Sequence, residues 1–153
     1  MPAAPERRRA ITTREEAERF LAAFAETMGE LEAVLDEETR EIAAGRIRAG
    51  LAQEARKSAL AGGYLQGLEH ARANAVAIAR FAPEEAGRLK EAHVGFRAAL
   101  ERNQTVLATA KAVSEGLVKG VAEAMAQQVR PSGYGSGAAT PRGAGPIAYS
   151  GRI

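Results

Sequence analysis

The sequence contains no cysteine and no tryptophan, and only 5% of its residues are aromatic. Without cysteine there is no disulfide, no thiolate metal site and no thiol catalysis. Large aliphatic and phenylalanine residues are also scarce, at 29 of 153, which argues against a sheet protein and against a wide buried catalytic cavity. No run approaches the roughly 18 apolar residues of a membrane span. We therefore expect no membrane insertion and a cytoplasmic protein.

Alanine is abundant instead, with 35 residues, and the net charge is only +2. A disordered chain normally combines few large apolar residues with a high net charge, and the second condition is missing here. Alanine, leucine, glutamate and arginine all favour helix. The expected fold is all-α, an elongated antiparallel three-helix bundle or coiled coil with one long C-terminal helix and disordered tails.

Proline, glycine and arginine divide the chain into three parts. Residues 1–12 carry two prolines and the run Arg7 to Arg9 without apolar periodicity, which predicts a disordered basic arm. Residues 13–130 form the expected helical domain. Residues 131–153 are rich in glycine and proline and are expected to be a disordered tail.

The first helix is predicted to begin at Thr12 or Thr13, because Glu15 and Glu16 follow them at the spacing of a capping box. It extends to about residue 45. Apolar residues in steps of three and four then predict one buried stripe, which Glu38 interrupts. The stripe consists of Ala17, Leu21, Phe24, Met28, Leu31, Leu35 and Ile42, widened by Phe20 and Val34.

A turn or kink is expected between Gly45 and Gly50, followed by a second helix over residues 51–80. The pair Gly62 and Gly63 either allows close helix packing or marks a bend. A third helix is predicted to start at Pro83 and to reach about residue 129, since proline suits the first helical position. Its stripe contains Leu89, Phe96, Leu100, Asn103, Leu107, Ala110, Leu117, Val121 and Ala124.

Residues that could carry chemistry do not cluster in the sequence. Gly67 and Lys90 stand three positions before His70 and His93, where a helical metal site would need glutamate. Bases are interleaved with acids and lack aromatic neighbours, which argues against nucleic acid binding. We therefore expect no enzyme, no cofactor and no metal.

Charge differs between the predicted helices, since residues 13–45 sum to −7 and residues 46–130 to +5. Opposite charges can steer the first helix onto the other two. Alternatively, they give the third helix a positive face for an acidic partner. The first interpretation needs no external molecule.

Two further features suggest binding. The end of the third helix carries a broad apolar face that Gly116 and Gly120 interrupt. These glycines allow close packing within the protein, or the face docks another protein. The tail carries Tyr134 and Tyr149, and tyrosine is a common binding anchor.

The segment from Asn103 to Val118, followed at a short distance by Tyr134-Gly135, resembles the C-terminal helix and tyrosine-containing tail of FlgN-type flagellar export chaperones, most closely their alphaproteobacterial branch. A looser likeness covers residues 13–135. It includes the Arg56-Lys57 pair and Tyr64 of the second helix. In that family the proteins are helical, cytoplasmic and non-enzymatic, and they escort hook-filament junction (hook-associated) proteins to the flagellar type III export gate.

The resemblance implies that an apolar face holds a client helix, through Leu107, Val113, Leu117, Val118, Val121 and Met125. It implies that Tyr134 docks to the export gate, although the extension after Tyr134 is longer than expected and offers Tyr149 as a second candidate. A monomer or weak homo-oligomer is expected. The alternative is a self-associating structural or adaptor coiled coil without a secretion client.

Overall fold

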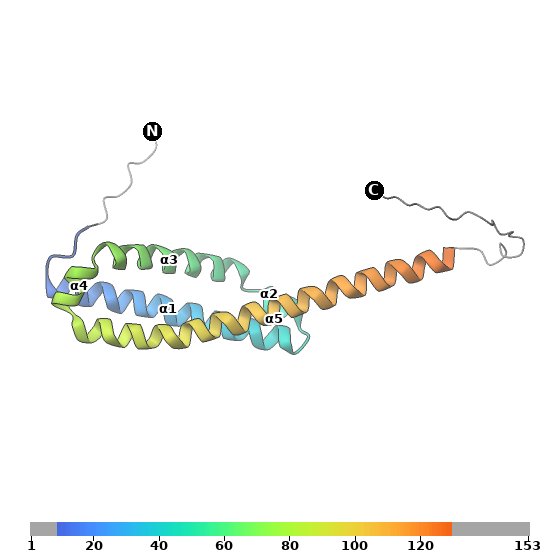
Figure 1. Cartoon of the computed structure of the whole chain (residues 1–153), viewed down its shortest axis with the longest axis horizontal. Helices are drawn as coiled ribbons and strands as arrows, with labels where there is room; N and C mark the ends of the chain where they lie inside the picture. The colour runs from blue at the N-terminus through green and yellow to red at the C-terminus, as the bar shows by residue number, and fades with distance from the viewer. Residues whose placement is uncertain (1–8, 130–153) are drawn as a thin grey trace, which may run out of the picture. The chain divides into compact units, whose positions relative to one another are not determined.

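The computed structural model describes residues 9–129, and this part of the chain is helical, without strands. The prediction of an all-α protein with packed helices is confirmed. Five helices follow one another along the chain (Figure 1): α1 (Arg14–Ala43), α2 (Ile47–Leu51), α3 (Glu54–Ala73), α4 (Ala75–Phe81) and α5 (Pro83–Val129).

The chain divides into two units, Met1–Ala110 and Lys111–Ile153, so the division falls inside α5. We had expected one helical domain over residues 13–130. The boundary lies earlier because every described side chain from Lys111 to Gln128 is exposed, whereas the helices before Ala110 bury a shared core. The predicted tail, residues 131–153, lies outside the described residues.

Helix α1 begins with the predicted capping box. The Thr13 hydroxyl accepts a hydrogen bond from the backbone N–H of Glu16 at 3.1 Å, and the Glu16 carboxylate accepts one from the backbone N–H of Thr13 at 3.3 Å. The same carboxylate accepts from the backbone N–H of Thr12, at 2.8 Å, and from its hydroxyl. These hydrogen bonds lower the pKa of Glu16, with the Thr12 backbone as the largest cause.

The apolar stripe predicted for α1 is the face that the fold buries. Each of its seven residues is buried, as is Val34, while Phe20 is half-buried. Glu38, the polar interruption, is buried as well, at 3% exposure. The period of the sequence therefore located the core of this helix, and Glu38 must find polar partners inside it.

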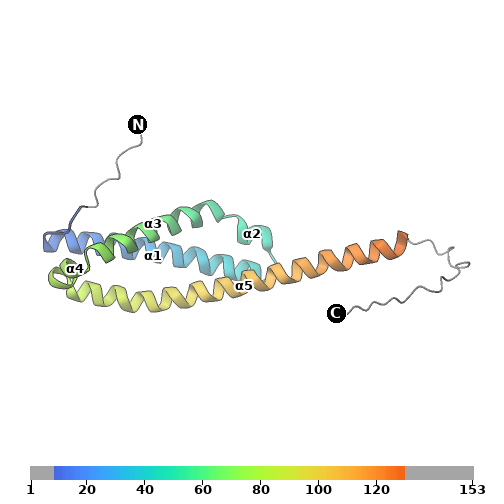
Figure 2. The same ribbon diagram turned by 45° about the horizontal axis from the view of Figure 1, so that its top comes forward.

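Helix α3 lies along α1 in the opposite direction (Figures 1 and 2). Its late residue Gly67 contacts the ring of Phe24, early in α1, whereas Lys57 at its start meets Glu38. The first part of α5 runs in the same direction as α1. Phe96 packs in one cluster with Met28, Leu31 and Leu35.

The predicted second helix, over residues 51–80, is two helices in the structure, α3 and α4, and the short helix α2 occupies much of the turn expected between Gly45 and Gly50. Gly45 has a φ of +85°, which glycine adopts without steric cost, and this residue ends the first helix as a turn. The pair Gly62 and Gly63 lies inside α3 and does not break it. The chain breaks at Asn74 instead, between α3 and α4.

The side chain of Asn74 explains this break. Its Nδ2 donates to the carbonyl oxygen of His70 at 3.0 Å, in competition with the helical backbone, and its Oδ1 accepts from the backbone N–H of Ile11 at 2.9 Å. Ile11 is buried beside Ala17, Leu21 and Ile78. The prediction of a disordered arm over residues 1–12 is therefore wrong at its end, because residue 11 belongs to the core.

Candidate functional site

The predicted client-binding residues fall into two groups. Leu107 is half-buried in the first unit. The other five lie on α5 in the second unit and are exposed, by 56% to 67% of their surface: Val113, Leu117, Val118, Val121 and Met125.

These five residues share one side of α5. Four of them follow one another in steps of four and the fifth, Val118, follows Leu117 directly, so their side chains form a continuous apolar face. We call these five residues the α5 apolar face. Neither Gly116 nor Gly120 has a neighbouring side chain within 4 Å of where a Cβ would stand, so within the described residues nothing uses the close approach that glycine allows. Exposing five large apolar side chains to water on one helix is unfavourable. An exposed apolar face of this kind is typical of a protein-binding surface.

Charges on this stretch of α5 do not favour a partner of either sign. Lys111 and Glu115 lie 3.9 Å apart as an i, i+4 pair, and one further base and one further acid, Lys119 and Glu123, follow. Helical spacing places Lys119 and Glu123 on the side opposite to the α5 apolar face, whereas Lys111 and Glu115 border it, seven and three positions before Val118. The surface therefore offers hydrophobic contact rather than electrostatic attraction.

The predicted gate-docking residue, Tyr134, lies outside the described residues, as does Tyr149. The structure does describe Tyr64, whose hydroxyl is hydrogen-bonded to Nε2 of His93. The rings of Phe24, Phe96 and His93 surround Tyr64, with ring centroids 4.8 to 5.8 Å from it. Burial raises the pKa of Tyr64 above its ordinary value of 10.0.

Both histidines take part in this aromatic packing. His93 stacks on Phe96, and His70 makes an edge contact with Phe20 at 4.6 Å. Among residues 9–129, no group of three or more histidine and acidic side chains is placed to hold a metal ion.

A buried polar cluster links α1, α3 and α5. Oε1 of Glu38 accepts hydrogen bonds from Nζ of Lys57 at 2.9 Å and from Nδ2 of Asn103 at 2.8 Å. Asn103 also lies 3.2 Å from the Thr39 hydroxyl and 3.3 Å from the Leu35 carbonyl oxygen. Such a cluster fixes the register of the three helices, because shifting one helix by a turn would leave a carboxylate buried without partners. Sequence reasoning placed Glu38 and Asn103 on the buried stripes but did not pair them.

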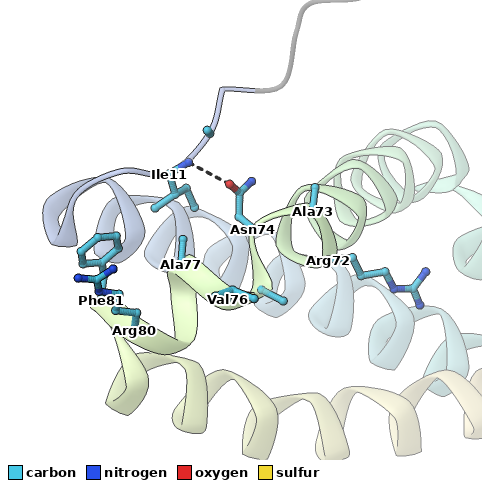
Figure 3. Close-up of a pocket in the computed structure, with 10 residues that line it drawn as sticks. Ile11, Arg72, Ala73, Asn74, Val76, Ala77, Arg80 and Phe81 are labelled. Carbon is cyan, nitrogen blue, oxygen red and sulfur yellow. Dashed lines mark hydrogen bonds between the residues drawn. The ribbon is translucent and has the colours of Figure 1, made fainter.

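A groove of about 420 Å³ lies at the junction of α3 and α4, and sequence reasoning missed it (Figure 3). The segment before α1 forms one wall, and Asn74 ties that segment to the junction through Ile11. Its remaining lining comes from α3 and α4: Arg72, Ala73, Ala75, Val76, Ala77, Arg80 and Phe81. No local pattern could have found the groove, since its walls are 63 positions apart in the sequence at the Ile11–Asn74 hydrogen bond.

Comparison with known proteins gives no relative: no family model, no curated protein and no solved structure matches the chain. Over residues 9–129, no helix has both the length and the apolar character needed to cross a membrane.

Proposed function

We propose that this protein is a cytoplasmic, non-enzymatic chaperone of the FlgN type, which binds hook-associated proteins, keeps them unassembled and delivers them to the flagellar export gate. The observation that carries this proposal is the α5 apolar face, with five large side chains exposed on one helix. The resemblance of residues 103–118 and Tyr134-Gly135 to that family supplies the identity of the clients. The finer architecture belongs to the same proposal: an elongated three-helix bundle with disordered tails.

The physical basis is a shared helical interface. A client whose terminal helices associate with one another must be shielded until it is exported. An amphipathic helix of the client can lay its apolar side along the α5 apolar face, as in helix-in-groove recognition. Burying apolar surface contributes roughly 25 cal/mol per Å². This mechanism needs neither ATP nor a catalytic residue.

Co-purification with the two hook-associated proteins tests the client interaction. The variant Leu117→Asp/Val121→Asp places two charges in the proposed interface and is expected to abolish binding. Both side chains are exposed, so the fold of the first unit should remain intact. Ala112→Asp is the matched control, because Ala112 is exposed on the opposite side of the same helix. Binding that survives the double substitution contradicts the proposal.

We propose Tyr134 as the residue offered to the export gate, with Tyr149 as its rival. Deleting residues 131–153 should leave client binding intact and weaken gate binding, because the tail adds a second contact and raises the local concentration of client there. Tyr134→Ala and Tyr149→Ala, made separately, identify the tyrosine that docks. If the deletion leaves the affinity for the export gate unchanged, the proposal that the tail binds the gate is refuted.

The alternative function, a self-associating structural or adaptor coiled coil, rests on the same exposed face, because a second copy could cover it. The oligomeric state, measured by light scattering, distinguishes the chaperone from the self-associating coiled coil. A monomer or weak oligomer that binds hook-associated proteins supports the chaperone. A stable homo-oligomer that Leu117→Asp/Val121→Asp dissociates, and that binds neither client, supports the coiled coil.

A further inference from the structure

The groove at the α3–α4 junction has an unusual combination of surface and charge. Of the residues that line it, two are arginines and none is acidic. Figure 3 shows these arginines, Arg72 and Arg80, at opposite ends of the groove, with Val76 between them. Val76 is 84% exposed, the highest fraction of any large apolar residue in the described chain.

The two arginines are available for an external partner. Seven of the twelve arginines among residues 9–110 pair with a nearby acid, as Arg14 does with Glu18 at 2.6 Å. Within the described residues, by contrast, Arg72 and Arg80 belong to no ion pair. Arg80 lies over the ring of Phe81, 5.5 Å from its centroid, which orients its guanidinium group without neutralising it.

Hydrogen bonds also hold the walls of the groove in place. Asn74 is 9% exposed and joins two chain segments by hydrogen bonds, so the floor and one wall are held together. In the sequence, the wall that contains Ala10 and Ile11 directly follows Arg7, Arg8 and Arg9, which adds further positive charge to this end of the chain.

We propose that this groove binds an acidic peptide segment that carries a bulky apolar side chain between carboxylates. The apolar side chain would pack against Val76 and its alanine neighbours, and the flanking carboxylates would pair with Arg72 and Arg80. Charge complementarity selects this occupant, because a basic segment would be repelled and a neutral one would leave both guanidinium groups without a partner. The site lies in the first unit and does not involve the α5 apolar face, so it is additional to the proposed client interaction.

A labelled Glu-Glu-Leu-Phe-Glu-Glu peptide probes the site with the full-length protein, by fluorescence anisotropy. Arg72→Glu/Arg80→Glu replaces two attractions by repulsions and is expected to weaken binding about tenfold or more. Raising the salt from 0.15 M to 0.5 M should weaken it in the same direction. Val76→Asp tests the apolar contact. All three side chains are exposed, so the substitutions should not unfold the protein.

Controls separate this site from other surfaces. Arg48→Glu changes an exposed arginine of α2 that is also outside any ion pair of the described residues, and it should leave binding within about twofold. Leu117→Asp/Val121→Asp should likewise leave the affinity for the labelled peptide unchanged. Conversely, the Arg72→Glu/Arg80→Glu variant should still co-purify with hook-associated proteins if these bind α5. The proposal is overturned if the probe does not bind, if the charge reversal leaves its affinity unchanged, or if the α5 substitutions abolish its binding instead.

Discussion

Replacing Lys57 by methionine tests the buried polar cluster. Methionine keeps most of the aliphatic stem but removes the ammonium group that lies 2.9 Å from Oε1 of Glu38. Losing one partner of a fully buried ion pair costs about 3–5 kcal/mol. The Glu38 side chain is 3% exposed and that of Lys57 is 21% exposed. Because water partly reaches the lysine and Asn103 still donates to the carboxylate, we expect a loss of about 2 kcal/mol in the free energy of unfolding.

A second substitution distinguishes an unpaired charge from a simple loss of packing. In Glu38→Leu/Lys57→Met the carboxylate is gone, and Asn103 retains the Leu35 carbonyl and the Thr39 hydroxyl as acceptors. The double variant should therefore be more stable than Lys57→Met alone, by about 1 kcal/mol or more.

Urea unfolding followed by circular dichroism at 222 nm measures both effects. With a denaturant slope of about 1–3 kcal/mol/M, a loss of about 2 kcal/mol lowers the midpoint by roughly 1 M. Lys90→Met is the control, since Lys90 is exposed and outside any ion pair of the described residues, and it should change stability by less than about 0.5 kcal/mol. The reasoning is refuted if the double variant is no more stable than Lys57→Met.

Three further predictions concern the first unit, and urea unfolding measures each of them. Gly67→Ala should destabilise the protein by about 1–3 kcal/mol, because its Cβ would stand 2.4 Å from Cδ2 of Phe24, a ring held between Phe20 and Tyr64. Gly62→Ala, in the same helix but with nothing within 4 Å, should stabilise it by up to about 1 kcal/mol; equal effects would contradict the close contact at Gly67. Thr13→Ala removes the N-cap of α1 and should cost about 1 kcal/mol, whereas Thr27→Ala, in the interior of α1, should cost less. Burial raises the pKa of Tyr64 above 10.0, so above that pH the folded state binds more protons than the unfolded state, and stability should fall as the pH rises. Tyr64→Phe should reduce this fall, and a pH dependence equal to that of the wild type would contradict the assigned cause.

The sequence predicted those features of the fold that depend only on residues close together in the chain. The capping box at Thr13, the apolar stripe of α1 and the start of α5 at Pro83 each arise from a local pattern that the fold does not override. The break at Asn74 was not predictable in this way. Its side chain bonds to Ile11, so a tertiary contact decides where the helix ends, while the more conspicuous pair Gly62 and Gly63 is tolerated inside α3.

Tertiary contacts explain why the first helix is acidic and the later helices are basic. Glu30 and Glu38 of α1 pair with Arg56 and Lys57 of α3, at 3.3 and 2.9 Å, and Asp36 of α1 lies 3.4 Å from Arg102 of α5. Of the two interpretations of the charge difference, these pairs favour the intramolecular one. Arg72 and Arg80 are among the bases of these helices that have no acidic partner in the described residues, and they differ from Arg48 in lining the groove at the α3–α4 junction.

The scarcity of large apolar residues bears on function as well as on fold. The core of the first unit is built with a few large side chains and with alanine, as at Ala17, Ala82 and Ala99, which are fully buried. Helices that approach closely over alanine need few large residues. The sequence nevertheless places five such residues on the exposed α5 apolar face, where they contribute nothing to that core. Exposed apolar residues concentrated on one helix of an alanine-rich chain are the reason for proposing a partner that covers them, and the Leu117→Asp/Val121→Asp experiment tests that proposal directly.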